Sequence, residues 1–309
     1  MLHSAITGAM MRKPRTRHVI DYLSELVSVI VPTFNSQGFI DNCLSSVKGQ
    51  SYAPIEIIVV DGFSGDRTVQ IAERYTSQVH RHGPDQGKER IFGAPYQRNY
   101  GVEMSHGEYV YYVDADMRLT KNVIASCVRA IKEHEADAVI VPEISQGKGF
   151  WSECRSLERS CHVGNDLVEA PRFFKKVVWQ ALDGLDPEIG GDDWDLYLRL
   201  KSEGFGAVRI RDSVVHDEGD LSLGKLAIKR YVYGKQVRKY LQRHGAVGLK
   251  QFFPVKNSHV TNLHLLAHDP VHAAGVVLMR TVEYTAGLFG LIGSGLSPSK
   301  TGLRRGQAS

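Results

Sequence analysis

The fold of this chain is decided by the stretch Tyr109–Met117, which reads Tyr-Val-Tyr-Tyr-Val-Asp-Ala-Asp-Met. Its first five residues are aromatic or β-branched and are apolar on both faces, which indicates an interior strand of a covered sheet. Two carboxylates follow at once, and carboxylates are buried inside a sheet only when they are paired or bound to a metal. We therefore expect Asp114 and Asp116 at the carboxyl end of the strand, where open α/β sheets bind ligands.

The Asp-x-Asp pair also points to a metal site. Side chains at positions i and i+2 of an extended chain point the same way, so Asp114 and Asp116 are expected to converge. Two hard oxygen ligands at one point suit Mg²⁺ or Mn²⁺. A polar turn after a strand is the plainer alternative, because the pattern is short.

Strands and helices alternate on both sides of this stretch. Further strands are predicted at 27–31, 55–60, 79–81, 138–142 and 208–215, and helices at 39–48, 66–75, 95–105, 122–134 and from 192 onward. A helix is also possible at 151–161, and 170–179 reads as a strand that turns into a helix. Strands that alternate with helices form parallel βαβ units with right-handed crossovers. The pattern therefore predicts an α/β fold with a mostly parallel central sheet flanked by helices.

Composition and length agree with a globular enzyme-sized chain. The 309 residues are 42% hydrophobic and 23% charged, enough for one large α/β domain with an appendage or for two domains. The four cysteines show no metal-binding or disulfide spacing, so reduced, buried thiols in a cytosolic protein are expected. Residues 1–26 read as a leader without the features of a signal peptide, 27–220 as the main domain and 221–309 as a separate C-terminal region.

Several other polar residues occupy positions that suit a site. Pro32 ends the first strand because proline cannot donate to a sheet, and Asp61 ends the second. Asp192 and Asp193 open a helix after two glycines, which allow close approach of a ligand. Acids also suit the positive end of a helix dipole, so helix stabilisation alone is the alternative explanation for them. His216 follows the strand predicted at 208–215, where a structural role competes with a ligand-binding one.

Taken in order, these motifs resemble those of the family 2 inverting glycosyltransferases, which have the GT-A fold, a Rossmann-like architecture. The resemblance covers roughly residues 27–226 and rests on five segments: 29–35 (Val-Ile-Val-Pro-Thr-Phe-Asn), 57–66 (ending Val-Val-Asp-Gly-Phe-Ser-Gly-Asp), Arg98-Asn99, Asp114-Ala115-Asp116, and 191–196 (Gly-Asp-Asp-Trp-Asp-Leu). Gly62, Met117 and Asp192 depart from the family pattern, which has an acid at the first two positions and a glutamate at the third. The Gln-x-x-Arg-Trp motif of processive synthases is absent from the sequence, which argues against a processive polymerase.

The resemblance implies a role for each candidate residue. Asp193 would be the general base that takes the proton of the acceptor, and Asp116, Asp114 and His216 would hold Mn²⁺ or Mg²⁺. The donor nucleotide would contact Pro32, Thr33, Asn35, Asp61, Arg98 and Asp114, with Thr33 beside Asp61 in neighbouring strands and Arg98 under the base or the diphosphate. Asp192 and Trp194 would face the acceptor.

The C-terminal region has a character of its own. Residues 221–309 contain thirteen basic and two acidic residues, a net charge of +11, which leaves −7 for residues 1–220. Such a basic segment indicates an anionic partner: a nucleic acid, a membrane surface or a phosphorylated substrate. The basic segment 225–250 follows His216 and is expected to flank the mouth of the site.

Residues 273–296 are largely apolar but are interrupted by Arg280 and Glu283, which are placed to pair at i and i+3. We expect a helical extension that lies on the membrane interface. A helical cap packed on the catalytic domain and a transmembrane hairpin are the alternatives.

Together these features predict an enzyme that uses a nucleotide-sugar donor and a lipid-linked or glycan acceptor. It is expected to be cytoplasmic and peripheral on the inner face of the cell membrane, in contact with anionic lipid. No nucleic-acid partner is expected, because no nucleic-acid motif accompanies the basic residues. Two other functions stay open: a nucleotidyltransferase that makes a nucleotide sugar, and a non-catalytic, nucleotide-responsive membrane adaptor. The sequence lacks the glycine-rich loop ending in Arg or Lys that binds the triphosphate in a nucleotidyltransferase. The presence of a full set of acidic site candidates argues against a non-catalytic adaptor.

Overall fold

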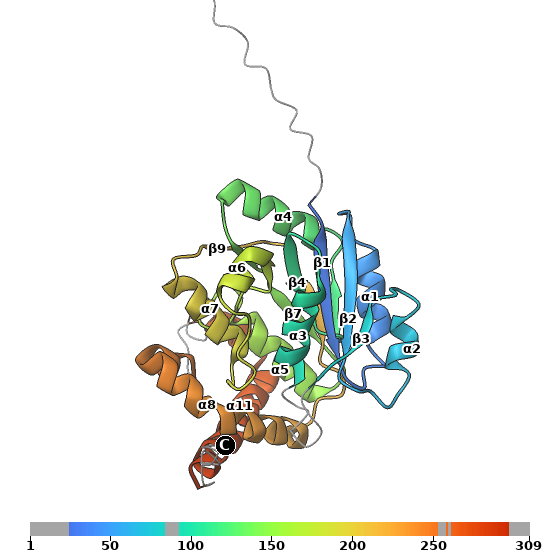
Figure 1. Ribbon diagram of the computed structural model, residues 1–309. Helices are drawn as coiled ribbons and strands as arrows, with labels where there is room; N and C mark the ends of the chain where they lie inside the picture. The colour runs from blue at the N-terminus through green and yellow to red at the C-terminus, as the bar shows by residue number, and fades with distance from the viewer. Residues whose placement is uncertain (1–24, 84–92, 253–257, 259–260, 297–309) are drawn as a thin grey trace, which may run out of the picture.

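The central element is a seven-stranded mixed sheet, seen in a computed structural model that describes residues 25–83, 93–252, 258 and 261–296 (Figure 1). Its strand order is β3-β2-β1-β4-β8-β6-β9. In that order the strands are Val79–Arg81, Ile55–Asp61, Val27–Thr33, Tyr109–Tyr112, Phe173–Lys175, Ala138–Ile140 and Ala207–Arg209. β4, the strand that begins the segment Tyr109–Met117, lies between β1 and β8, so its predicted position in the interior of the sheet is confirmed.

Parallel pairing aligns the ends of the strands that carry the candidate residues. β1 pairs in parallel with β2 and with β4, and Thr33 lies opposite Asp61 as expected. β8 is antiparallel to both of its neighbours, β4 and β6. The sheet is therefore mostly but not wholly parallel. The antiparallel strand turns the chain so that the segment just before it, which contains Arg172, reaches the same edge of the sheet as Asp114.

A second, three-stranded sheet with the order β5-β10-β7 continues from this edge. It consists of β5 (Met117–Leu119), β10 (Val214–Asp217) and β7 (Glu143–Gln146). The single strand predicted at 208–215 is wrong, because the chain leaves the main sheet after β9 and enters the second sheet at β10. In this sheet His216 lies opposite Met117 on one side and Ser145 on the other. The pairing brings His216 next to the Asp-x-Asp segment, about a hundred residues earlier in the chain.

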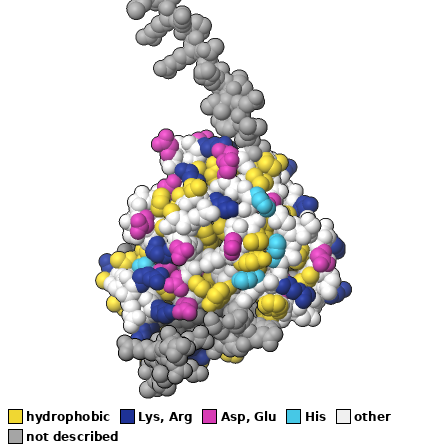
Figure 2. All heavy atoms as spheres, viewed as in Figure 1, with side chains coloured by type: hydrophobic (Ala, Val, Ile, Leu, Met, Phe, Trp, Pro, Cys, Tyr) yellow, Lys and Arg dark blue, Asp and Glu magenta, His cyan; other side chains and the backbone are white. Residues whose placement is uncertain are grey.

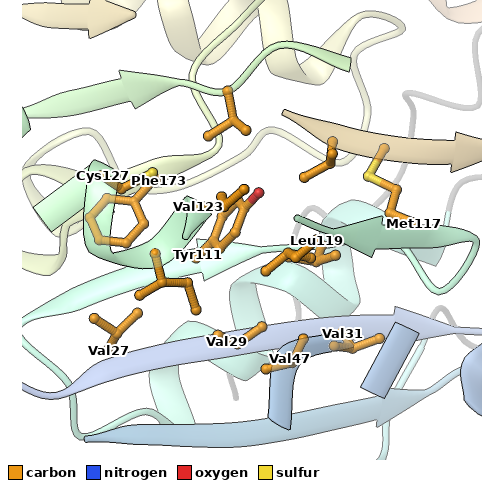
Figure 3. Close-up of a cluster of buried hydrophobic side chains, with 14 of the residues drawn as sticks. Val27, Val29, Val31, Val47, Tyr111, Met117, Leu119, Val123, Cys127 and Phe173 are labelled. Atoms are coloured by element: carbon orange, nitrogen blue, oxygen red, sulfur yellow. The ribbon is translucent and has the colours of Figure 1, made fainter. Parts of the chain in front are cut away.

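Helices cover both faces of the main sheet because alternate strand residues point to opposite sides. Val29 and Tyr111 face α1 (Ile40–Lys48) and α4 (Val123–His134), in the buried cluster drawn in Figure 3. Ile30 and Tyr112 face α3 (Gly93–Met104), α6 (Lys176–Ala181) and α7 (Asp192–Ser202). The short α2 spans Thr68–Ala72. All four cysteines are buried and unpaired, as the sequence predicts.

The C-terminal helices gather at the end of the molecule opposite α4 (Figure 1). They are α8 (Leu223–Phe252), which is broken at Gly245, then α10 (Leu263–His268) and α11 (Pro270–Leu296). α11 packs along α8 and against α5 (Phe150–Ser160), where Met279 and Val276 join a small core with Cys154. Because α11 is one continuous helix, a transmembrane hairpin within 273–296 is wrong. The leader predicted at 1–26 lies, except for its last two residues, outside the described residues.

Candidate active site

A cleft of about 550 Å³ opens at the carboxyl edge of the main sheet, where β1 and β4 end. One wall comes from these strand ends and the other from the first three turns of α8. Its lining residues are Pro32, Thr33, Phe34, Ala94, Gln97, Asp114, Asp116, Lys225, Ile228, Lys229 and Tyr233. Four of the residues predicted from the sequence thus meet here: Pro32, Thr33, Asp114 and Asp116. Lys225 and Lys229 confirm that the basic segment flanks the mouth of the site.

The Asp-x-Asp segment is a turn and not an extended chain. The amide of Met117 donates to the carbonyl of Asp114 at 2.9 Å, which closes a four-residue turn. The two carboxylates consequently have different partners. Asp114 accepts hydrogen bonds from Arg98 at 2.7 Å and from Arg172 at 3.0 Å, one on each oxygen. Burial opposes its ionisation, yet the two guanidinium groups outweigh burial and hold the pKa of Asp114 well below its usual range.

Asp116 faces His216 instead, with 3.2 Å between His216 Nε2 and Asp116 Oδ2. The other ring nitrogen of His216 lies 3.5 Å from Glu143 Oε2, which is too long for a well-formed hydrogen bond. Burial opposes protonation of the ring, but Asp116 and Glu143 raise the pKa of His216 to about 9. Among the described residues, the buried atoms Asp116 Oδ1 and His216 Nδ1 have no hydrogen-bond partner.

These residues fit a divalent cation that is held jointly with a substrate. Within the described part of the chain, no group of three or more His, Cys, Asp and Glu side chains is arranged to hold a metal by itself. Mg²⁺ and Mn²⁺ sites in transferases commonly use one or two protein ligands, with substrate phosphates and water completing the shell. Asp116 Oδ1, which has no hydrogen-bond partner in the described part of the chain, and the adjacent imidazole of His216 would supply two such ligands. Asp114, predicted as a third, is occupied by two arginines, so its role at the metal stays a prediction.

Arg98, on α3, is the centre of the charged network behind the cleft. Besides Asp114 it contacts Asp192 at 3.1 Å and Asp193 at 3.2 Å, and its guanidinium stacks over the ring of Tyr112 at 4.6 Å. We expected it under the nucleotide. The structure places it among carboxylates instead, where its charge allows three acidic side chains to lie close together.

The two acids that open α7 differ in their surroundings. Asp193 Oδ1 accepts a hydrogen bond from the hydroxyl of Tyr112 at 2.9 Å and another from Arg98. Burial and the neighbouring charge of Asp193 raise the pKa of Asp192 to about 7, although Arg98 opposes the rise. The helix begins after Gly191, whose φ of 95° lies in the left-handed region that favours glycine. This turn allows both carboxylates to face Arg98.

Asn35 and Asp61 hold the loop beside the cleft. Asp61 is fully buried, and both of its carboxylate oxygens accept hydrogen bonds from Ser64. Asn35 accepts one from the amide of Gly65 at 2.9 Å. Their predicted contact with the donor nucleotide stays a prediction. Thr33 is a better candidate, because it lines the cleft and its buried hydroxyl has no hydrogen-bond partner among the residues that the structure describes.

Trp194, predicted on the acceptor side, lies at the junction of α7 and α8. Its indole packs edge-on against Tyr240 and Phe252, and its nitrogen donates to the carbonyl of Val168 at 2.9 Å. It is not among the residues that line the cleft. The structure therefore gives Trp194 a supporting contact, and contact with the acceptor stays a prediction.

Four further residues of the site are not indicated by the sequence: Tyr112, Glu143, Arg172 and Tyr233. Tyr112 sits inside the strand that was recognised, but only the position of α7 shows that its hydroxyl meets Asp193. Arg172 bridges Asp114 and Glu143, at 3.0 and 2.7 Å. A single arginine before a short strand carries no local signal of such a role. Its antiparallel strand would have had to be placed in the sheet first.

The family assignment comes from comparison with known proteins. Residues 28–180 match the family model described as glycosyl transferase family 2. The glycosyltransferase GlyG of Streptococcus pneumoniae is 34% identical over 122 residues, which cover 38% of this chain and 39% of that one. The poly(ribitol-phosphate) β-N-acetylglucosaminyltransferase TarS of Staphylococcus aureus is 33% identical over 116 residues, which cover 37% of this chain and 20% of TarS. The matched part is thus well under two thirds of the length of these relatives.

Two solved structures share the architecture. The mannosyltransferase PcManGT from Pyrobaculum calidifontis, in complex with GDP-Man and Mn²⁺, superimposes with a TM-score of 0.61 at 19% identity and covers 87% of each chain. TarS residues 1–349 from S. aureus, in complex with UDP-GlcNAc, give a TM-score of 0.50 at 18% identity. The superposition covers 84% of this chain and 90% of that one. At these identities the likeness concerns the fold. The chain belongs to glycosyltransferase family 2 and has the GT-A fold. This membership favours a sugar transferase over the nucleotidyltransferase and the adaptor.

Proposed function

We propose that this protein transfers a sugar, with inversion, from a nucleotide-diphosphate sugar to a hydroxyl or phosphate acceptor. The observation that carries the proposal is the composition of one cleft. Carboxylates Asp114 and Asp116 line it together with Lys225 and Lys229, and Arg98 links Asp193 to Asp114. The complexes of PcManGT with GDP-Man and of TarS with UDP-GlcNAc support a nucleotide-sugar donor.

The residues on the donor side are suited to a diphosphate leaving group. Asp116 and His216 would hold Mn²⁺ or Mg²⁺, which when bound would neutralise negative charge that grows on the diphosphate. Lys225 and Lys229 are four residues apart on α8 and line the same cleft, so they present two further positive charges to the phosphates. The Mn²⁺ in the PcManGT complex supports such a cation.

The residues on the acceptor side are suited to taking a proton. The acceptor oxygen attacks the anomeric carbon from the face opposite the diphosphate, the bond from that carbon to the diphosphate oxygen breaks, and the acceptor proton passes to Asp193. Tyr112 and Arg98 both donate hydrogen bonds to Asp193 Oδ1 and fix its orientation. Oδ2 lies 3.9 Å from Arg172 and makes no hydrogen bond among the described residues, so it is the oxygen that would accept the proton.

For the acceptor we propose a lipid-linked carrier or a glycan built on one, met at the cytoplasmic face of an anionic membrane. Support comes from the position of α8, which carries basic residues at the cleft and packs along the largely apolar helix α11. An acceptor that carries phosphate or stands on anionic lipid would be attracted by this wall.

The proposal is tested by incubating the protein with UDP- and GDP-sugars and measuring the free nucleoside diphosphate released, with and without Mn²⁺. Asp116→Asn should lower turnover at least about 100-fold, since the charge stabilisation from a bound cation amounts to several kcal/mol. Calorimetry of UDP or GDP binding should show that this variant also loses the Mn²⁺-dependent part of the affinity.

Asp41→Asn is the matched control, because Asp41 is half-exposed in a surface pair with Arg74. It should behave like the unmodified protein. Formation of a nucleotide sugar from a sugar phosphate, or full activity of Asp116→Asn, would contradict the proposal. The configuration of the product at the anomeric carbon, read by NMR, tests inversion.

A further inference from the structure

The outward face of α11 carries no charge over its described length. Its exposed large side chains are Val271, Val277, Leu278, Leu288, Phe289 and Ile292, and the other exposed positions from 271 to 292 are alanine or threonine. The spacing follows one side of a helix. Twenty-two residues correspond to roughly 33 Å of helix. A soluble monomer rarely exposes so long an apolar stripe without a partner for it.

The inward face of α11 is fixed to the catalytic part of the molecule. Glu283 is buried and binds Arg155 of α5 at 2.5 Å, while Arg280 lies 3.1 Å from Glu158 of the same helix. Gly290 has no room for a side chain, because a Cβ there would collide with the carbonyl oxygen of Tyr231 on α8. These contacts hold α11 along the surface of the protein.

The same helix is, by length and composition alone, able to cross a membrane: Pro270–Gly293 has a mean hydropathy of 1.3. Spanning would require it to leave α5 and α8 and to carry Arg280 and Glu283 into lipid, where each charge is costly. A helix with one charged, packed face and one uncharged, exposed face is instead suited to lying in the plane of a membrane interface.

The apolar stripe continues to the cleft through α8. Tyr231 meets α11 at Gly290 and is exposed. Ile228, one turn earlier on α8, is 63% exposed and lines the cleft. Exposed lysines, Lys225 and Lys229, stand beside Ile228 at the cleft, and no acidic residue occurs between positions 221 and 250. Apolar contact area bordered by cations is the combination that anionic lipid surfaces attract.

We propose that the outer face of α11, with Ile228 and Tyr231 of α8, docks on an anionic lipid bilayer in an orientation that places the mouth of the cleft at the lipid surface. The acceptor would then be an amphiphile whose apolar tail stays in the bilayer while its polar head enters the cleft. The statement about the acceptor rests on the proposed function. The statement about docking does not, and can be tested without any turnover.

The experiment is flotation of the full-length protein with phosphatidylcholine vesicles, with and without phosphatidylglycerol. The test variant is the triple substitution Leu288→Gln, Phe289→Gln, Ile292→Gln. The control is Val177→Gln, because Val177, at 68%, is more exposed than any of the three replaced residues but lies on α6. The unmodified protein and the control should float with anionic vesicles. The triple variant should bind the vesicles at least about tenfold more weakly, because the loss of even one apolar side chain from lipid contact is expected to lower the affinity by about tenfold.

A second measurement does not depend on the stability of the triple variant. Phe289→Trp should show tryptophan fluorescence that is quenched by lipids brominated in their acyl chains, whereas Val177→Trp should not. Raising salt from about 0.1 M to about 0.5 M should weaken binding without abolishing the quenching of the bound fraction, because the apolar contact is not screened.

Three results would overturn the docking proposal: no flotation of the unmodified protein, equal flotation of the triple variant, or equal quenching of the two tryptophans. Self-association in the absence of vesicles that the triple variant abolishes would assign the stripe to a second copy of the chain and also overturn it. Release of nucleoside diphosphate in solution should be the same for the unmodified protein and the triple variant. Its absence in both would count against the proposed function and leave the docking result standing.

Discussion

Replacing Glu283 with glutamine tests whether α11 is an integral part of the fold. Glu283 is 3% exposed and lies where α5, α8 and α11 meet. Its carboxylate accepts hydrogen bonds from Arg155 at 2.5 Å, Arg230 at 3.0 Å and Arg280 at 3.2 Å. Glutamine keeps the size of the side chain but removes its charge and turns one acceptor into a donor that faces guanidinium groups.

The magnitude follows from the charges that would stay behind. Three guanidinium groups share two carboxylates, Glu158 and Glu283, so the variant leaves one carboxylate for three cations. Loss of one partner from a buried ion pair costs about 3 to 5 kcal/mol. Arg230 is 41% exposed and can be hydrated, which favours the lower end, about 3 kcal/mol. For a chain of 309 residues that corresponds to a fall in Tm of roughly 5 °C.

Thermal and urea unfolding followed by circular dichroism at pH 7 measure the effect. The control is Glu188→Gln, which breaks an exposed pair with Lys239 in which both side chains are more than half exposed. It should cost less than about 1 kcal/mol. If Glu283→Gln were no more destabilising than Glu188→Gln, the buried network would not hold α11 in place. The helix could then detach, and the argument against a membrane-spanning orientation would be lost.

Further predictions concern the acids of the site and of the sheet. Asp193→Asn should lower kcat by a factor of about 10² to 10⁴ and leave nucleotide affinity within about twofold, whereas Asp192→Asn should lower kcat less than about tenfold. If steady-state kinetics showed the larger loss for Asp192→Asn, the general base would be Asp192. Because the pKa of Asp192 rises from 3.8 to about 7 on folding, the folded state binds more protons in that window and stability falls as pH rises through it. Asp192→Asn should therefore raise Tm more at pH 8 than at pH 5. Tyr112→Phe removes the hydrogen bond to Asp193 and should lower kcat about tenfold with little change in donor KM, and an unchanged kcat would show that the hydroxyl does not position the base. Burial of Glu56 is outweighed by hydrogen bonds from Ser28 and His106, which lower its pKa from 4.5 to about 2, so its stabilising effect is present above pH 4.5 and disappears as pH falls toward 2. Glu56→Gln should cost about 2 kcal/mol at pH 7 and nothing near pH 2 in urea titrations, and a pH-independent loss would contradict the assignment.

The parts of the fold that were predictable are those with a strong local pattern. Residues 27–33, 55–61 and 109–112 are short, apolar and end in polar residues, and all three are strands of the main sheet. Because parallel strands end at the same edge, the meeting of Thr33, Asp61 and Asp114 at that edge followed from sequence alone.

The parts that were not predictable depend on pairing between distant segments. His216 reaches Asp116 because β10 pairs with β5 in a second sheet, and both strands are too short to leave a clear pattern. Arg172 reaches Asp114 because β8 is antiparallel to β4. Neither the register nor the direction of these strands is contained in three or four residues, so their side chains could not be placed at the site beforehand.

The charge of the C-terminal region shows a different limit of the sequence. Counted from the sequence alone, the net charge of +11 over residues 221–309 indicates a free basic surface. In the structure, part of that charge is neutralised by acids of the main domain: Lys239 by Glu188, and Arg243 by Asp186. On the face shown in Figure 2, acidic and basic side chains lie interspersed. The basic residues that matter for an anionic partner are therefore those at the cleft, and their number is smaller than the count implies.

The helix α8 connects the two halves of the proposed mechanism. Its first turns supply Lys225 and Lys229 to the donor side of the cleft. Farther along, Arg243 at 3.0 Å and His244 at 2.8 Å bind Asp195, a fully buried residue in the first turn of α7, the helix that begins with Asp192 and Asp193. Residues on both sides of the predicted domain boundary at residue 220 therefore contribute to the same site. A bilayer that holds α11 would hold α8 as well, and with it the cationic wall of the cleft and the support of the general base.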